Sequence, residues 1–267
     1  MNFENVYWDW DSMRDDHHAA SILAIGDSWF WYPFPGGSLL NRLGPLVAPK
    51  EHYILAIGNN GAEAFDYVHG KYKSAVTTAL NFHGDGLSAV FISGGGNDFA
   101  GLNDLLPLLN ADCTNAHSAE DCFKPGNSDS TLDGLMKKLT EEYTLLIGQI
   151  MMKCPTGIKI LVHNYDYAIP LGQDVFGGDA GWLKPALDDA LVPEGLQRDC
   201  IKLIINQFSD VLQTLEDQGN GQVVFVDSRN TLADADWANE LHPKPGGFKK
   251  IAVKKWQPAL KKCKLAK

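Results

Sequence analysis

The 267-residue sequence has few basic side chains, no long hydrophobic run and no CxxC cysteine pair. Its 23 Lys and Arg face 33 Asp and Glu, giving a formal net charge of −10. This balance argues against nucleic acid or an anionic membrane surface as the main partner. The basic residues clustered between 249 and 267 are typical of the solvated face of a last helix. No apolar stretch approaches the roughly 18 residues that a membrane span requires, so we expect no integral membrane segment.

The first 20 residues lack the apolar core of a signal peptide and carry five acidic side chains. We interpret residues 1–20 as an N-terminal extension and expect a cytoplasmic protein, unless a leader was removed before the numbering begins. The five cysteines show no zinc-binding pattern. Cys113 and Cys122 fall in one polar loop, and a disulfide between them would instead indicate an exported protein in an oxidising compartment.

Short apolar runs alternate with longer helical patterns along the chain, and a hydrophobic fraction of 45% is enough for a sizeable core. This order predicts an α/β fold with a parallel sheet covered by helices on both faces, in one domain over residues 21–267. We expect five strands, at 21–26, 52–57, 88–93, 158–163 and 222–226. We expect helices at 38–47, 62–80, 131–152 and 197–215, and a last one from about 247.

Two connections are long for an α/β protein, where such loops usually have about 2–6 residues. They cover residues 103–130 and 164–196, each after a predicted strand. Ligands bind at the carboxyl edge of an open parallel sheet, where the segments after the strands gather. We therefore expect both insertions to lie over that edge, as lids or substrate-binding elements.

Four short polar segments follow predicted strands at this same edge. They are Gly26-Asp27-Ser28, Gly58-Asn59-Asn60-Gly61, Gly94-Gly95-Gly96-Asn97-Asp98 and Asn239-Glu240-Leu241-His242. Each alone could be an ordinary turn or helix cap. Together, Ser28 and His242 supply a nucleophile and its general base. The Ser28 N–H, the Gly61 N–H and the Asn97 side-chain amide would donate to a developing oxyanion.

With these segments in this order, the sequence resembles the SGNH (GDSL-type) hydrolases, from about residue 21 to 263. The GDS block matches Ser28, the second-block glycine matches Gly61, the GxND block contains Asn97, and the fifth-block histidine matches His242. The resemblance implies a flavodoxin-like three-layer α/β/α fold and ester hydrolysis through an acyl-enzyme, without a metal or organic cofactor. Asp27 is expected to support the nucleophile turn.

The sequence departs from the family at one position, because the aspartate usual three residues before the histidine is Asn239. Three interpretations are open. Asn239 could orient the imidazole through its side-chain oxygen, as Asn does in Cys-His-Asn proteases. A nearby carboxylate, Asp236 or Glu240, could reach the ring instead. A Ser-His dyad could also work with a backbone acceptor as the orienting group.

The segment after the nucleophile is unusually aromatic, and we name Trp29, Trp31 and Tyr32 as candidate substrate-binding residues. These rings could line an acyl pocket or stack on a sugar, or pack the first helix on the sheet. The leading hypothesis is a serine carboxylic-ester hydrolase acting on short-to-medium acyl esters or O-acyl groups of small molecules, glycans or lipids. The alternatives are a thioesterase or acyltransferase on the same residues, and a weakened glycan- or lipid-binding module. Oligomeric state is not predicted.

Overall fold

The computed structural model describes residues 5–31, 37–173 and 181–267. Its centre is a six-stranded, all-parallel sheet in the order β1-β3-β2-β4-β5-β6. The strands are β1 (Val6–Tyr7), β2 (Ile22–Gly26), β3 (Ile54–Gly58), β4 (Ala89–Ser93), β5 (Lys159–His163) and β6 (Val223–Val226). The last five are the strands that the sequence predicts. Their residues are buried except Gly58 and Lys159 at strand ends and the half-buried Phe225, which is why they are apolar rather than alternating.

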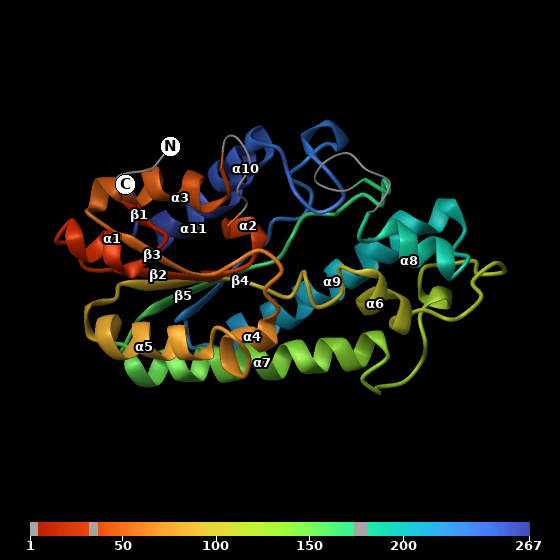
Figure 1. Ribbon diagram of the computed structural model, residues 1–267, viewed down its shortest axis with the longest axis horizontal. Coiled ribbons are helices and arrows are strands. Elements are labelled where there is room, and N and C mark those ends of the chain that lie inside the picture. Colours follow the sequence, from red (N-terminus) through yellow and green to blue (C-terminus); the bar gives the residue numbers. More distant parts are fainter. Residues whose placement is uncertain (1–4, 32–36, 174–180) are drawn as a thin grey trace.

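Helices cover both faces of the sheet (Figure 1), as the α/β alternation predicts. On one face lie α3 (Leu40–Val47), α10 (Pro245–Ile251) and α11 (Gln257–Lys262); on the other lie α4 (Ala64–Val68), α5 (Lys73–His83), α7 (Leu132–Lys153) and α9 (Glu194–Gln218). The short helices are α1 (Trp10–Asp15), α2 (Ser28–Trp31), α6 (Leu102–Leu105) and α8 (Lys184–Asp189). The three-layer α/β/α architecture is therefore confirmed.

The prediction of five strands was one too few, because the N-terminal segment contributes a sixth. Val6 pairs with Ile54 and Tyr7 with Leu55, which places β1 at the sheet edge beside β3. Asn5 reinforces this edge, since its side-chain amide donates to the carbonyls of Gly44 and His52. A two-residue strand is too short to show the period-2 alternation by which strands are recognised. Residues 5–7 are thus part of the sheet rather than an appendage to it.

The single helix predicted over 62–80 is two helices, α4 and α5. The first ends at Val68, and the Gly70 N–H turns back to the carbonyl of Phe65. The N–H of Tyr72 bonds to the carbonyl of Asp66, and α5 then starts at Lys73. Glycine at such a point is expected, because it is a poor helix residue and a common helix terminator.

The cysteines of the first insertion are free thiols. Cys113 and Cys122 are both buried, and the Cys113 sulfur donates to the Cys122 carbonyl at 3.5 Å. Burial raises the pKa of the Cys113 thiol to about 11. The disulfide that we considered between them is therefore not formed in this structure. No helix in the described ranges is both long and apolar enough to cross a bilayer.

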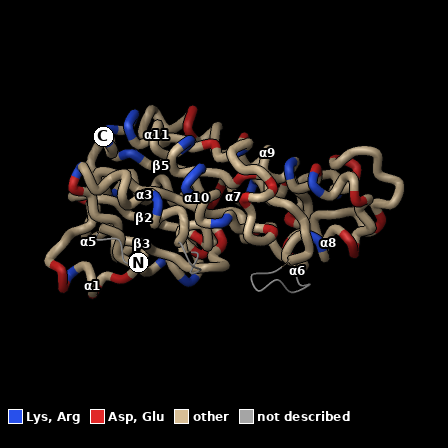
Figure 2. The backbone as a smooth tube through the Cα atoms, turned by 90° about the horizontal axis from the view of Figure 1, so that it is seen from above, with Lys and Arg blue, Asp and Glu red and all other residues tan. Residues whose placement is uncertain are grey.

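The basic C-terminal residues lie on α10, on the π-helical segment Ala252–Trp256, on α11 and in the tail that follows α11 (Figure 2). Lys250 pairs with Asp236 at 2.7 Å, and Lys255 donates to the carbonyl of Arg229 at 3.1 Å. These contacts fasten the last helices to the loop that follows β6. Residues 241–267 contain no Asp or Glu, so the charged side chains of this last segment are all basic.

Candidate active site

The site begins at the turn between β2 and α2, where strand order reverses in a sheet of this kind. Asp27 caps α2, because its carboxylate accepts the Trp29 N–H at 3.0 Å and its carbonyl accepts the N–H groups of Phe30 and Trp31. The buried Asp27 carboxylate also accepts the Ser93 hydroxyl at 2.8 Å. Burial raises the Asp27 pKa, while these donors oppose the shift. Hydrogen bonds from the start of α2 and from Ser93 on β4 therefore fix Asp27, the residue before Ser28.

Ser28, His242 and Asn239 form one connected chain of hydrogen-bonding groups. Ser28 Oγ lies 2.8 Å from His242 Nε2, and His242 Nδ1 lies 3.1 Å from Asn239 Oδ1. The same Oδ1 accepts the backbone N–H groups of Leu241 and His242, at 3.0 and 2.9 Å. These two donors identify the oxygen, and not the NH₂ group, as the atom facing the ring. Nδ1 must therefore carry the proton, which leaves Nε2 free to accept the Ser28 hydroxyl proton.

Burial lowers the pKa of His242 to about 3. A carboxylate at the position of Asn239 would favour the imidazolium, whereas the amide supplies orientation without charge. The imidazole is therefore neutral, and able to take a proton, across the whole neutral and mildly acidic range.

The two carboxylates considered as orienting groups have other partners. Glu240 is fully buried, and its oxygens accept the N–H groups of Gly172, Trp182, Leu183 and Lys184 at 2.5–3.1 Å. Asp236 pairs with Lys250 and accepts the N–H of Ala233. Glu240 thus anchors the second insertion to the histidine loop instead of touching the ring. That anchor brings the Trp182 ring edge-on to His242, with centroids 5.9 Å apart.

The candidate oxyanion donors come from the loops after β2, β3 and β4. Ser28 is the first residue of α2, and such N–H groups have no partner within their own helix. Asn97 Nδ2 donates to the carbonyl of Ala62 at 2.9 Å, and its amide has a second N–H to offer. Ala62 directly follows Gly61, so this bond ties the two loops together. Gly61 has φ +74°, and a Cβ there would meet no atom of the described residues within 4 Å.

Gly58 is required for a different reason, because a Cβ there would lie 2.0 Å from the Gly26 carbonyl oxygen. Its φ of +120° is also one that other residues rarely adopt. The close approach of β3 to the nucleophile turn therefore depends on this glycine.

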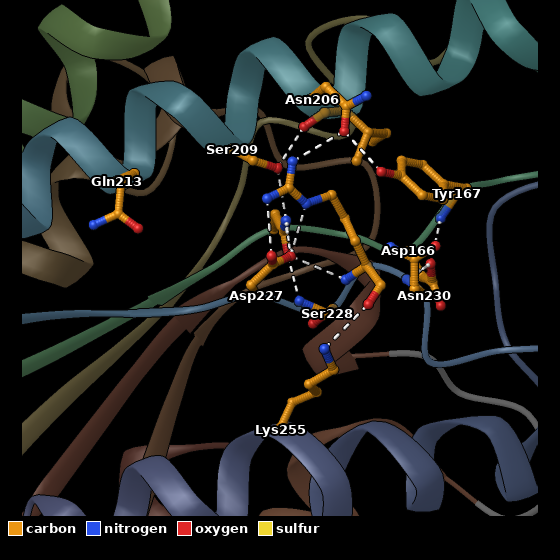
Figure 3. Close-up of polar contacts among 12 residues, drawn as sticks. Asp166, Tyr167, Asn206, Ser209, Gln213, Asp227, Ser228, Asn230 and Lys255 are labelled. Carbon is orange, nitrogen blue, oxygen red and sulfur yellow. Dashed lines mark hydrogen bonds and ion pairs between the residues drawn. The ribbon is translucent and has the colours of Figure 1, made fainter.

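A partly buried polar network fixes the loops after β5 and β6 (Figure 3). Asp166 accepts the N–H groups of Asn230, Thr231 and Leu232 at 2.7–2.8 Å. Asn164 donates to Ser209 on α9 and to Asp227, and Asp227 in turn pairs with Arg229 at 2.8 Å. These contacts tie the start of the second insertion to the segment that leads toward His242.

The three aromatic candidates separate in space. Trp29 is buried, donates its indole N–H to the carbonyl of Leu241 at 3.0 Å, and lines a small cavity together with Ser28 and Asn97. Trp31 lines a different groove, of about 420 Å³, with Trp8, Trp10 and Tyr72. Tyr32 lies outside the described residues.

Tyr165 is a site residue that sequence reasoning missed. Its hydroxyl donates to Asp27 at 2.5 Å and accepts the Gly96 N–H at 3.1 Å, so it links the nucleophile turn to the loop of Asn97. Its position just after the predicted strand 158–163 was the only available signal, since tyrosine there is compatible with ordinary packing. Within the described part of the chain, no group of three or more His, Cys, Asp or Glu side chains could hold a metal ion.

No protein-family model and no curated protein matches the sequence. Solved structures do match. An extracellular lipase from Streptomyces rimosus has a TM-score of 0.53 at 18% identity, with 92% of this chain and 100% of the lipase covered. A G-D-S-L family protein from Desulfitobacterium hafniense, described as lipolytic, has a TM-score of 0.50 at 13% identity, with 87% and 95% covered. A family two carbohydrate esterase from Clostridium thermocellum has a TM-score of 0.52 at 12% identity, with 91% of this chain and 63% of that one covered. The chain thus has the SGNH hydrolase fold.

Proposed function

We propose that the protein is a serine carboxylic-ester hydrolase that acts through an acyl-enzyme on Ser28. The observation that carries this proposal is a continuous chain of two hydrogen bonds through the His242 ring. Ser28 Oγ lies 2.8 Å from His242 Nε2, and His242 Nδ1 lies 3.1 Å from Asn239 Oδ1. The lipase and the carbohydrate esterase that share the fold are named for ester hydrolysis, which supports the same reaction class here.

In the proposed reaction, Ser28 Oγ attacks the acyl carbonyl carbon while its proton passes to His242 Nε2. The carbonyl oxygen becomes an oxyanion that accepts the N–H groups of Ser28 and Gly61 and the Asn97 amide. The tetrahedral intermediate then breaks its bond to the alcohol oxygen, which takes the proton from Nε2. Water repeats the sequence on the acyl-enzyme, giving its proton to His242, and releases the carboxylic acid and free Ser28. Asn239 holds the ring in the tautomer that each step requires.

The test combines turnover with covalent labelling of the nucleophile. Wild-type protein is expected to hydrolyse p-nitrophenyl acetate and to gain the mass of one phosphonyl group from an alkyl fluorophosphonate. Ser28→Ala should lose both properties, because the attacking oxygen is gone. Ser74→Ala, at an exposed position on α5, is the matched control and should retain both.

Labelling at a residue other than Ser28 would contradict the proposal. So would a wild-type protein that is folded, unlabelled and inactive on oxygen esters. The binding module would then be the better hypothesis, in which the same cleft holds a glycan or lipid without turnover.

A further inference from the structure

The cavity beside the nucleophile is small and almost entirely apolar. Its volume is about 30 Å³. Besides Ser28 and Asn97 its lining includes Phe99, Ala168 and Ile205, together with the carboxylates Asp27 and Asp166. Both carboxylates are already engaged by hydrogen bonds, Asp27 with Ser93, Trp29 and Tyr165, and Asp166 with backbone N–H groups. The cavity therefore suits a short hydrocarbon group and offers little to a polar one.

The position of the cavity indicates which half of an ester it receives. Ser28 and Asn97, the nucleophile and a candidate oxyanion donor, are among the residues that line it, whereas His242 is not. The leaving oxygen must meet His242 Nε2 to be protonated. A group that occupies the cavity is consequently the substituent on the acyl side of the carbonyl carbon, and the alcohol lies toward the histidine.

We infer that the enzyme is selective for acyl groups of two or three carbons, an inference that rests on the proposed ester hydrolysis. A single water needs about 10–15 Å³ of such volume, and a methyl group is of similar size. A cavity of about 30 Å³ therefore has room for the methyl of an acetyl group or the ethyl of a propionyl group. Longer chains would run against the side chains that line the cavity, which come from α9 and from the loops after β4, β5 and β6.

The experiment measures kcat/KM for p-nitrophenyl acetate, propionate, butyrate, hexanoate and octanoate. The wild type is expected to prefer acetate or propionate and to lose at least tenfold by hexanoate. One methylene that does not match a pocket typically changes kcat/KM by roughly 10- to 200-fold, so this drop is measurable.

Two neighbouring isoleucines on α9 provide a matched pair of variants. Ile205 lines the cavity and Ile204 does not, although both are buried on the same helix. Ile205→Ala should enlarge the cavity and move the optimum toward butyrate or hexanoate, by at least tenfold in the ratio to acetate. Ile204→Ala removes the same atoms elsewhere and should keep the wild-type profile. Ala168→Val, which fills the cavity, should lower propionate hydrolysis at least tenfold relative to acetate, and serves if Ile205→Ala does not fold.

Each outcome has a distinct meaning. A wild type that turns over octanoate as well as acetate overturns the inference while leaving ester hydrolysis in place. An equal shift in Ile204→Ala and Ile205→Ala also overturns it, because general loosening would then set the profile. Absence of turnover on every ester contradicts the proposed function itself.

Discussion

Replacing Asn239 with aspartate tests how the histidine is held. Asn239 Oδ1 already lies 3.1 Å from His242 Nδ1 and accepts two backbone N–H groups, and a carboxylate oxygen can accept the same three donors. The substitution adds one negative charge beside the ring. Two opposite charges about 4 Å apart interact by roughly 4 kcal/mol at an effective dielectric constant near 20, which corresponds to about three pKa units. Opposite charges near titrating groups typically produce shifts of about 1–3 units.

The His242 pKa should therefore rise from about 3 to roughly 4–6 in Asn239→Asp. Because kcat/KM reports the free enzyme, its acid limb should move upward by the same amount. The carboxylate also stabilises the imidazolium that forms in the transition state, so the plateau value should increase by about 10- to 1000-fold. A gain above about 10⁴-fold is not expected, since the reverse change in Ser-His-Asp enzymes costs about that much.

The assay is kcat/KM for p-nitrophenyl acetate between pH 4 and 9, with protein kept at pH 7.5 and diluted into each buffer immediately before measurement. Asn103→Asp, an exposed position on α6, adds the same charge away from the ring and should leave the profile unchanged. A wild-type acid limb near pH 6.5, or identical limbs in wild type and Asn239→Asp, would refute the reasoning.

Three further perturbations test other features. Glu240→Gln should lower the free energy of unfolding by about 2–4 kcal/mol, because an amide NH₂ would face backbone N–H donors. Glu141→Gln, on the exposed side of α7, is the control and should leave the free energy of unfolding in urea unchanged. Equal effects of the two substitutions would contradict the anchoring role of Glu240. Burial lowers the pKa of His163 from 6.5 to about 4 in the folded protein. As the pH falls below 6.5, the histidine of the unfolded chain is therefore protonated before that of the folded protein. The free energy of unfolding should decrease over this range, down to the folded-state pKa. His163→Gln should remove about 2 kcal/mol of the stability lost between pH 7 and pH 5, and an unchanged loss would show that another group is responsible. Asn97→Ala should lower kcat by about 10²- to 10³-fold with little change in KM, and a loss below threefold would remove it from the oxyanion hole.

The sequence predicted the parts of the fold that rest on long or strongly apolar patterns. The five main strands, α3, α7 and α9 occur close to the expected residues, and Ser28 and His242 are brought together although 214 residues separate them. The short β1 was missed because two residues cannot display a period. The break at Gly70 was missed because a single glycine is tolerated inside many helices.

Partner choice within the site was harder to predict than position. Asn239, Glu240 and Asp236 are all close to His242 in sequence, and only the backbone geometry distinguishes them. Glu240 is turned toward the N–H groups of residues 172 and 182–184, in an insertion whose path the sequence does not determine. The cavity likewise collects side chains from five separate segments, so its volume depends on packing that no local pattern encodes.

The pairing of Ser28 with His242 has a consequence for biosynthesis. Trp29 makes a second bond across almost the same span, to the carbonyl of Leu241. During synthesis Ser28 is made early, whereas His242 is made only when all of the chain except its last helices, α10 and α11, is complete. Contacts of such long range form late, since the intervening chain must be ordered first. A nascent or truncated chain that ends before residue 242 would thus carry the serine without the means to activate it. Recovery of turnover after dilution from denaturant would in turn report completion of the whole fold.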